Sequence, residues 1–245
     1  MSDTYDHVTP SELSYESMSQ LLKETRRLGG AFVENPDFAV EGFARSANTF
    51  LVTALNVSWP DMVVRSHSHQ SSFLRAADGQ FPVVSVLRNP LDAIASYSVH
   101  QSVQDPDRAR DLASLMDEYG DVVSSAAGNP NVFILPFEKV VFDIAGTLDL
   151  LETKYGLTNR VYVSPDVIFS QTTDLSKRAN KSEELFAKKG HVPRSKDSRY
   201  AEVLAELQGP PCEKALHDLT RMYDGLVHNY YKSVGESFPS AESTT

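Results

Sequence analysis

The stretch Phe38-Ala-Val-Glu-Gly-Phe-Ala-Arg-Ser-Ala-Asn-Thr-Phe50 decides which fold we expect. Its first three residues are apolar and predict a buried strand, and a short helical pattern follows from Phe50 to Val57. Residues 42–49 between them have the spacing of the phosphate-binding sequence G-x-x-x-x-G-K-[ST], which joins a strand to a helix. Two letters differ, because Ala47 replaces the second glycine and Asn48 replaces the lysine.

This loop suits an anion that is held by backbone N–H groups at a helix N-terminus. It lacks the lysine that reaches the β- and γ-phosphates of a nucleoside triphosphate, and its cation, Arg45, comes earlier in the loop. Thr49 is a potential Mg²⁺ ligand, but no expected strand ends in the aspartate that nucleoside triphosphatases use to hold the metal. Ordinary triphosphate hydrolysis is therefore disfavoured. Taken alone, the segment is equally compatible with a turn that binds no ligand.

A second junction between a strand and a helix lies further along the chain. The run FPVVSVL over residues 81–87 predicts a strand that is covered on both faces, and Arg88 follows it. Asn89 and Pro90 are favourable as the cap and the first residue of a helix, and Ser96 lies two turns into that helix. Ligands of open α/β sheets bind at the carboxyl edge, so this arginine and hydroxyl are candidates for an anion site. An ion pair and a packing serine are the alternative interpretations.

Strand and helix patterns alternate along the chain. The expected strands cover residues 38–40, 62–64, 81–87 and 131–135, and the expected helices cover 11–28, 50–57, 90–99, 138–155 and a segment from 211 onward. This alternation predicts an α/β fold with three layers, in which helices flank a mostly parallel central sheet. We expect one domain over residues 1–234 and a disordered tail over 235–245.

Composition and charge narrow the function classes. The 245 residues are 41% hydrophobic and carry a formal net charge of −10, which argues against sequence-independent binding of nucleic acid. Residues 175–199 nevertheless hold eight Lys or Arg against three Asp or Glu, and this local excess suits a small polyanion. The one cysteine, Cys212, excludes an internal disulfide and a cysteine-rich zinc site. Without a long apolar run or a secretory signal, we expect a cytoplasmic protein.

With these motifs, the chain resembles the P-loop sulfotransferases that use 3′-phosphoadenosine 5′-phosphosulfate (PAPS). The family's 5′-phosphosulfate loop often reads P-R-S-G-N-T-W-L, and residues 44–51 read A-R-S-A-N-T-F-L. Its 3′-phosphate motif, R-N-P-x-D-x-x-x-S-Y, is matched in full by residues 88–97. Where the family has Lys-Thr-His at a strand end, this chain has Arg65-Ser66-His67. The resemblance spans roughly residues 38–195 and implies a P-loop α/β fold.

The resemblance also implies which residues bind the donor and its product, adenosine 3′,5′-bisphosphate (PAP). Those that would hold the 5′-phosphosulfate share the first loop: Arg45, Ser46, Ala47, Asn48 and Thr49. Phe50 takes the place of a tryptophan that stacks on adenine, and Phe137 replaces a tyrosine near the adenine. Arg88 and Ser96 would bind the 3′-phosphate. Lys188-Lys189-Gly190 resembles a late Arg-Lys-Gly element that closes on the 3′-phosphate.

The implied reaction is an in-line transfer of a sulfuryl group to an acceptor hydroxyl or amine. A hydroxyl is a weak nucleophile and needs a base with a pKa near neutrality, so we assign His67 as the general base. Arg65 would help Arg45 to stabilise the leaving phosphate. His69 and His100 are weaker candidates on the substrate side. A metal site of the histidines lacks a matching carboxylate, so we expect none.

Two other functions stay open at this point. One is a P-loop nucleotide kinase or nucleoside triphosphatase, and the other is a sulfotransferase-like module that binds a nucleotide without catalysis. The acceptor is also open, and its pocket is expected from residues 68–80, 100–112 and 191–200. A carbohydrate, a lipid, a small phenol or another small molecule, or a protein tyrosine would be suitable, and the sequence does not indicate the oligomeric state.

Overall fold

The computed structural model describes residues 36–66, 69, 71–104, 111–180 and 198–236. Its described strands form a sheet of four in the order β2-β1-β3-β4, and every neighbouring pair is parallel. The strands are β1 (Phe38–Glu41), β2 (Val64–Ser66), β3 (Val83–Leu87) and β4 (Val132–Pro136). In register, Val40 lies opposite Ser66 on one side and Val84 on the other. The strand ends that precede the two candidate loops therefore meet at one edge of the sheet.

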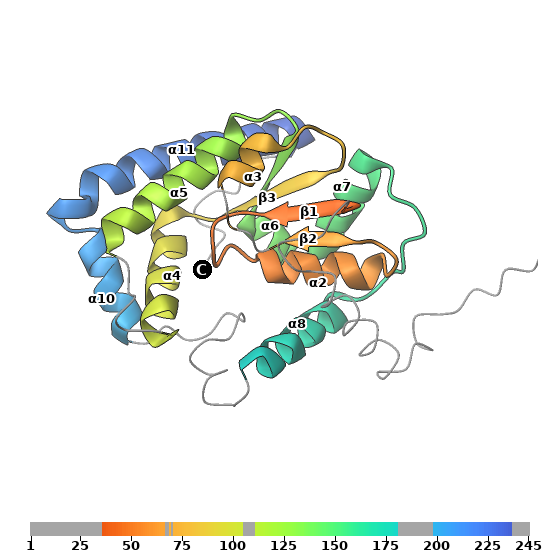
Figure 1. The fold of residues 1–245 in the computed structure, drawn as a ribbon, viewed down its shortest axis with the longest axis horizontal. Coiled ribbons are helices and arrows are strands. Elements are labelled where there is room, and N and C mark those ends of the chain that lie inside the picture. The colour runs from red at the N-terminus through yellow and green to blue at the C-terminus, as the bar shows by residue number, and fades with distance from the viewer. Residues whose placement is uncertain (1–35, 67–68, 70, 105–110, 181–197, 237–245) are drawn as a thin grey trace, which may run out of the picture.

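Helices cover both faces of this sheet, which confirms the expected α/β fold (Figure 1). Helices α3, α5 and α11 lie on one face, α2 and α8 lie on the other, and α4 and α10 stand beyond the carboxyl ends of the strands. The described helices are α2 (Asn48–Ser58), α3 (Ser71–Ala76), α4 (Pro90–Gln104), α5 (Leu112–Ala127), α6 (Phe137–Phe142), α7 (Ile144–Tyr155), α8 (Pro165–Asn180), α10 (Ser198–Leu207) and α11 (Pro210–Val234).

The two central strands are buried along their whole length, as their apolar sequences predict. Every residue of β1 and β3 is buried, because helices cover both faces of a parallel sheet. Glu41 is the charged exception at the carboxyl end of β1, with 1% of its surface exposed. A buried carboxylate is costly unless it is hydrogen-bonded, so Glu41 needs polar partners at the edge of the sheet where the first candidate loop begins.

Several expected boundaries differ from the structure. The second strand was expected at residues 62–64, whereas β2 begins at Val64. The expected helix over 138–155 is two helices, because Asp143 leaves the helical conformation and its carboxylate accepts a hydrogen bond of 3.0 Å from the Gly146 N–H at the start of α7. The helix expected over 90–99 continues to Gln104. The helix expected over 11–28 lies outside the described residues.

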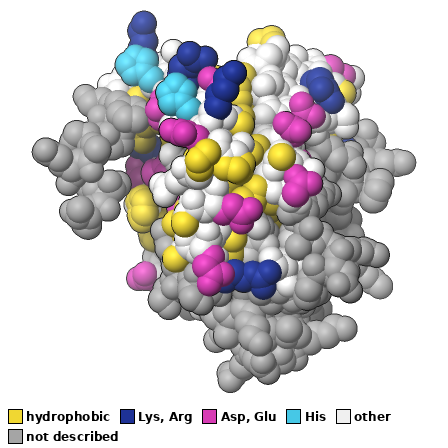
Figure 2. All heavy atoms as spheres, turned by 90° about the vertical axis from the view of Figure 1, so that its left-hand side faces the viewer, with side chains coloured by type: hydrophobic (Ala, Val, Ile, Leu, Met, Phe, Trp, Pro, Cys, Tyr) yellow, Lys and Arg dark blue, Asp and Glu magenta, His cyan; other side chains and the backbone are white. Residues whose placement is uncertain are grey.

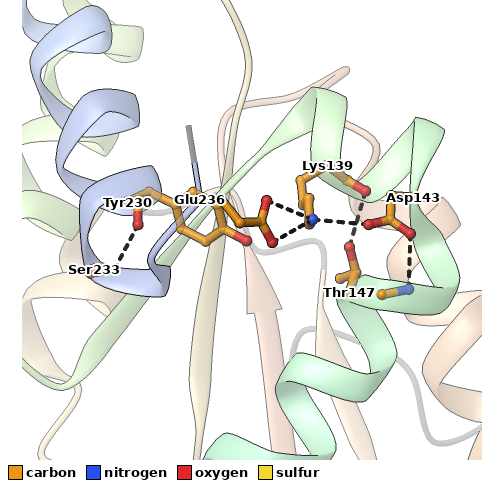
Figure 3. Close-up of polar contacts among 7 residues, drawn as sticks. Lys139, Asp143, Thr147, Tyr230, Ser233 and Glu236 are labelled. Carbon is orange, nitrogen blue, oxygen red and sulfur yellow. Dashed lines mark hydrogen bonds and ion pairs between the residues drawn. The ribbon is translucent and has the colours of Figure 1, made fainter. Parts of the chain in front are cut away.

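The end of α11 is fastened to α6 through Lys139 (Figure 3). The Lys139 ammonium lies 2.8 Å from the Glu236 carboxylate and 2.9 Å from Asp143. Glu236 belongs to the segment that we expected to be a disordered tail, yet this contact includes it in the described fold. Residues 237–245 lie outside the description.

The face made by the outer ends of α4, α5, α10 and α11 mixes charges of both signs (Figure 2). A band of hydrophobic side chains runs down this face, with acidic and basic side chains on either side of it. Over the coloured part of this face no continuous basic surface forms, such as a nucleic-acid-binding protein presents. Within the described residues, no helix combines the length and the apolar character that crossing a bilayer requires.

Candidate functional site

The phosphate loop, residues 42–49, has a backbone that is unusual for its sequence. Gly42 has φ 151°, and a Cβ atom there would lie 2.6 Å from the Val86 carbonyl oxygen of β3, so only glycine fits. Arg45 and Ala47 adopt positive φ angles of 68° and 62° without being glycine. Such residues cost about 1–2 kcal/mol each and are concentrated at functional sites. The loop thus holds a strained conformation that the surrounding packing imposes.

Helix α2 begins directly after this loop, with Ala47 at its N-cap position. Alanine has no side-chain acceptor, so the N–H groups of the first turn of α2 lack the usual cap. Two buried oxygens nearby, Ser46 Oγ and Asn48 Oδ1, make no hydrogen bond to any described residue. Uncapped N–H groups at a helix start attract anions. The loop is suited to bind an anionic group.

Asn48 does not replace the lysine that the phosphate-binding sequence usually has. Its Nδ2 donates to the carbonyl oxygens of Gly42 at 3.3 Å and Phe43 at 3.2 Å. The side chain therefore closes the loop on itself instead of extending toward a triphosphate. This observation disfavours the nucleoside triphosphatase interpretation on structural grounds.

Two arginines meet at the loop, because Arg45 lies within it and Arg88 follows the neighbouring strand β3. Arg88, after β3, donates from NH1 to the Arg45 carbonyl oxygen at 2.9 Å, and Arg45 Nε donates to Ser96 Oγ of α4 at 3.3 Å. Burial, with a smaller effect of the positive charge of Arg88, lowers the pKa of Arg45 to about 10. Among the described residues, no carboxylate lies within ion-pair distance of Arg88. Both arginines are partly buried, and an anion bound beside them would offset the repulsion between the two positive charges.

Arg88 is held through both its side chain and its backbone. Its guanidinium carbon lies 4.6 Å from the ring centroid of Phe137, which is a cation–π contact. The hydroxyl of Tyr119, on α5, donates to the Arg88 carbonyl oxygen at 2.7 Å. Burial raises the pKa of the nearby Glu138 carboxyl, while hydrogen bonds and the charge of Arg88 act to lower it. These contacts fix the guanidinium at the carboxyl edge of the sheet.

Two hydrogen-bonded pairs of a tyrosine and a carboxylate near Arg88 were not among the predicted site residues. Tyr200 of α10 donates to Asp92 Oδ1 at 2.5 Å, and Tyr223 of α11 donates to Glu138 Oε2 at 3.2 Å. Burial and the acidic partners raise the pKa of both tyrosines, so both hydroxyls keep their protons. Asp92 belongs to the matched motif and was available as a signal, but no local pattern relates it to a tyrosine 108 residues away.

The end of β2 contributes Arg65 and His69. Arg65 stacks on Phe73, with its guanidinium carbon 4.0 Å from the ring centroid. The backbone N–H of His69 donates to Glu41 Oε2 at 3.0 Å, and the ring Nδ1 of His69 lies 2.8 Å from the Gly42 carbonyl oxygen. Since a carbonyl oxygen only accepts, we assign a proton to Nδ1 in this contact. His69 is thus tied to the start of the phosphate loop.

The remaining candidates are not brought into this arrangement by any described contact. Phe50 is half-buried on α2 and packs against the core, and His100 is half-buried on α4. His67 and Lys188-Lys189-Gly190 lie outside the described residues. In the described part of the chain, no three His, Cys, Asp or Glu residues are grouped so that they could hold a metal ion.

No protein-family model matches the chain, and no curated protein matches it in sequence. Among solved structures, it is similar to the crystal structure of mouse sulfotransferase SULT7A1 complexed with PAP, at 13% identity and a TM-score of 0.45. That match covers 85% of this chain and 89% of the other.

Proposed function

We propose that this chain is a sulfotransferase that takes a sulfuryl group from PAPS and gives it to an acceptor hydroxyl or amine. One observation carries the proposal: Arg45, Arg88 and Ser96 are joined by hydrogen bonds beside the uncapped start of α2. The two segments that supply them are those that match the family's two phosphate motifs. A bisphosphate carries two anionic groups, and this arrangement offers two cationic side chains and a helix N-terminus to receive them.

Each binding residue then has a stated task. The N–H groups of residues 46–49 and the Arg45 guanidinium hold the 5′-phosphosulfate, while Arg88 and Ser96 hold the 3′-phosphate. Phe50 faces the adenine. Phe137 positions Arg88, because the cation–π contact keeps the guanidinium in place. Lys188, Lys189 and Gly190 complete the 3′-phosphate site in the proposal.

In the reaction, PAPS supplies the sulfuryl group and PAP is the product that remains. His67 takes the proton of the acceptor hydroxyl as the acceptor oxygen bonds to sulfur. Arg65 and Arg45 face the negative charge that develops on the bridging oxygen when its bond to sulfur breaks. The proton ends on His67 and leaves to solvent, so charge and atoms balance. The arginines provide the positive charge that a metal would otherwise supply.

A transfer assay with labelled PAPS over several acceptor classes tests this function. We expect product with at least one acceptor, and loss of that product in His67→Ala with PAP affinity nearly unchanged, because the base does not hold the nucleotide. Turnover near that of the unaltered enzyme in His67→Ala would remove the base assignment.

Thermal shifts with PAP and with ATP and Mg²⁺ separate the alternative functions. A nucleotide kinase is stabilised by ATP and Mg²⁺, whereas an inactive module is stabilised by PAP and shows no transfer.

A further inference from the structure

A buried tyrosine of helix α11 reaches the segment that contacts Arg88. The Tyr223 hydroxyl donates to Glu138 Oε2 at 3.2 Å, and the two residues are 85 positions apart in the chain. Burial, followed by the charge of Glu138 and the hydrogen bond to it, raises the pKa of Tyr223, so the hydroxyl keeps its proton and is the donor. Only 7% of the Tyr223 surface is exposed, so water competes little for this bond.

Glu138 lies in the first turn of α6, next to the residue that stacks on Arg88. Helix α6 starts at Phe137, directly where β4 ends, and its N-cap residue Pro136 makes no side-chain cap hydrogen bond. The Phe137 ring centroid lies 4.6 Å from the Arg88 guanidinium carbon. A helix this short is weakly held by its own backbone bonds, so a side-chain bond to its first turn influences where Phe137 lies.

The backbone of Arg88 depends on the same group of helices. Tyr119 of α5 donates to the Arg88 carbonyl oxygen at 2.7 Å. Burial, and then its neighbours Tyr223 and Glu138, raise the pKa of Tyr119. Helix α11 packs along α5 and against β4, from which α6 continues (Figure 1). Tyr223 thus lies where α5, α6 and α11 meet, close to both contacts that hold Arg88.

We propose that Tyr223 is a positioning residue of the 3′-phosphate site. Its hydroxyl holds Glu138, which fixes the start of α6, and the Phe137 ring then keeps the Arg88 guanidinium directed toward the 3′-phosphate. A tyrosine that only fastened α11 to the fold would affect every ligand of the site alike, whereas one that acts through Arg88 affects ligands that carry a 3′-phosphate. This inference rests on the proposed function, because it assigns a further residue to the same donor site.

Calorimetry with two nucleotides tests the assignment in Tyr223→Phe, which removes the hydroxyl and keeps the ring. We expect PAP to bind about three- to tenfold more weakly, the scale of one lost hydrogen bond. Adenosine 5′-monophosphate, which has no 3′-phosphate, should bind within about twofold of its affinity for the unaltered protein. Tyr230→Phe is the matched control and should change neither affinity, because Tyr230 is buried on the same helix and its hydroxyl makes no hydrogen bond to a described residue.

A double-mutant cycle tests the route through Phe137. Phe137→Leu removes the cation–π contact with Arg88, so adding Tyr223→Phe in that background should cost less than about twofold in PAP affinity. A further loss of about three- to tenfold in the Phe137→Leu protein would show that Tyr223 acts elsewhere, and the inference would be wrong.

A second pair of variants tests the same bond from its acceptor side. Glu138→Gln and Glu138→Leu both remove the charge, but only glutamine keeps an oxygen that can accept from Tyr223. We expect Glu138→Leu to bind PAP about three- to tenfold more weakly than Glu138→Gln does. Equal affinities of these two variants would contradict the inference even if Tyr223→Phe did not fold.

The outcomes for the inference and for the proposed function are distinguishable. Unchanged PAP affinity in Tyr223→Phe, or equal losses for both nucleotides, would overturn the inference while the proposed function stands. The expected pattern of PAP affinities without transfer to any acceptor would support Tyr223 as a positioning residue and contradict the proposed activity. If the unaltered protein does not bind PAP, both fail.

Discussion

Arg88→Ala is the sharpest test of the donor site. The substitution removes the guanidinium that faces the 3′-phosphate in the proposal, together with the bond from NH1 to the Arg45 carbonyl oxygen and the stacking on Phe137. A hydrogen bond to a charged group contributes about 1.5–3 kcal/mol, and each 1.4 kcal/mol is about tenfold in affinity. We therefore expect PAP to bind about 10- to 100-fold more weakly to Arg88→Ala.

The neighbouring Arg45 does not account for such a loss. Its pKa of about 10 is lowered first by burial and then by the charge of Arg88, so removing Arg88 raises that pKa. Arg45 is protonated at pH 7 in both proteins, and its charge toward the phosphosulfate is unchanged. What Arg88→Ala perturbs in the loop is the single bond to the Arg45 carbonyl oxygen.

Two ligands separate this local perturbation from the lost phosphate contact. Calorimetry with PAP measures both effects, whereas calorimetry with adenosine 5′-monophosphate, which has no 3′-phosphate, measures the loop perturbation alone. We expect a large loss for PAP and a small one for the monophosphate. Arg88→Lys, which keeps the charge and loses the planar fork, should fall between the two proteins. Equal losses for both ligands, or no loss for PAP, would refute the 3′-phosphate role.

Two further predictions concern the stability of the fold. Gly42→Ala should lower the free energy of unfolding in urea by at least about 1–3 kcal/mol, because its Cβ would lie 2.6 Å from the Val86 carbonyl oxygen. Gly225→Ala on α11, where a Cβ meets no atom within 4 Å, should instead raise the free energy of unfolding. Similar losses of stability in both variants would contradict this reasoning. Burial acts to raise the pKa of Asp143, but hydrogen bonds from Lys139 and the Gly146 N–H hold it below the usual value. Because the pKa is lower in the folded state, the stabilising effect of the Asp143 charge is complete above about pH 4 and is lost as the pH falls through the lowered pKa. The stability difference between the unaltered protein and Asp143→Asn, measured by unfolding in urea, should shrink in acid, and a difference that is independent of pH would contradict this reasoning.

Local sequence patterns predicted both loops and the strands before them. The apolar runs of β1 and β3 and the cap residues Asn89 and Pro90 act over a few residues, so a sequence shows them directly. Helix α5 had an equally clear signal that we did not use: Asp111 caps it by accepting from the Ser114 N–H at 2.7 Å, and buried apolar residues recur along it at helical spacing. Its existence was predictable from sequence.

The sequence also offers a possible helix break at Asp143, but it does not show whether the helix ends there. Aspartate is tolerated within a helix and is also a good N-cap, and local preference does not decide between the two. In the structure, Asp143 is the cap of α7 and an ion-pair partner of Lys139, which also binds Glu236. The cap bond to Gly146 and the ion pair with Lys139 both favour the second arrangement.

The sequence by itself determined which residues could receive phosphate groups: a loop with Arg45 before one helix, and Arg88 and Ser96 around the start of another. Only the tertiary structure decided that these groups share one site. The strand order β2-β1-β3-β4 places the ends of β1 and β3 side by side, so residues 43 positions apart form a hydrogen bond. The same order brings His69 within hydrogen-bond distance of the Gly42 carbonyl oxygen. Short-range preferences fix each element, whereas the pairing of strands is a long-range choice made by burial of the whole sheet.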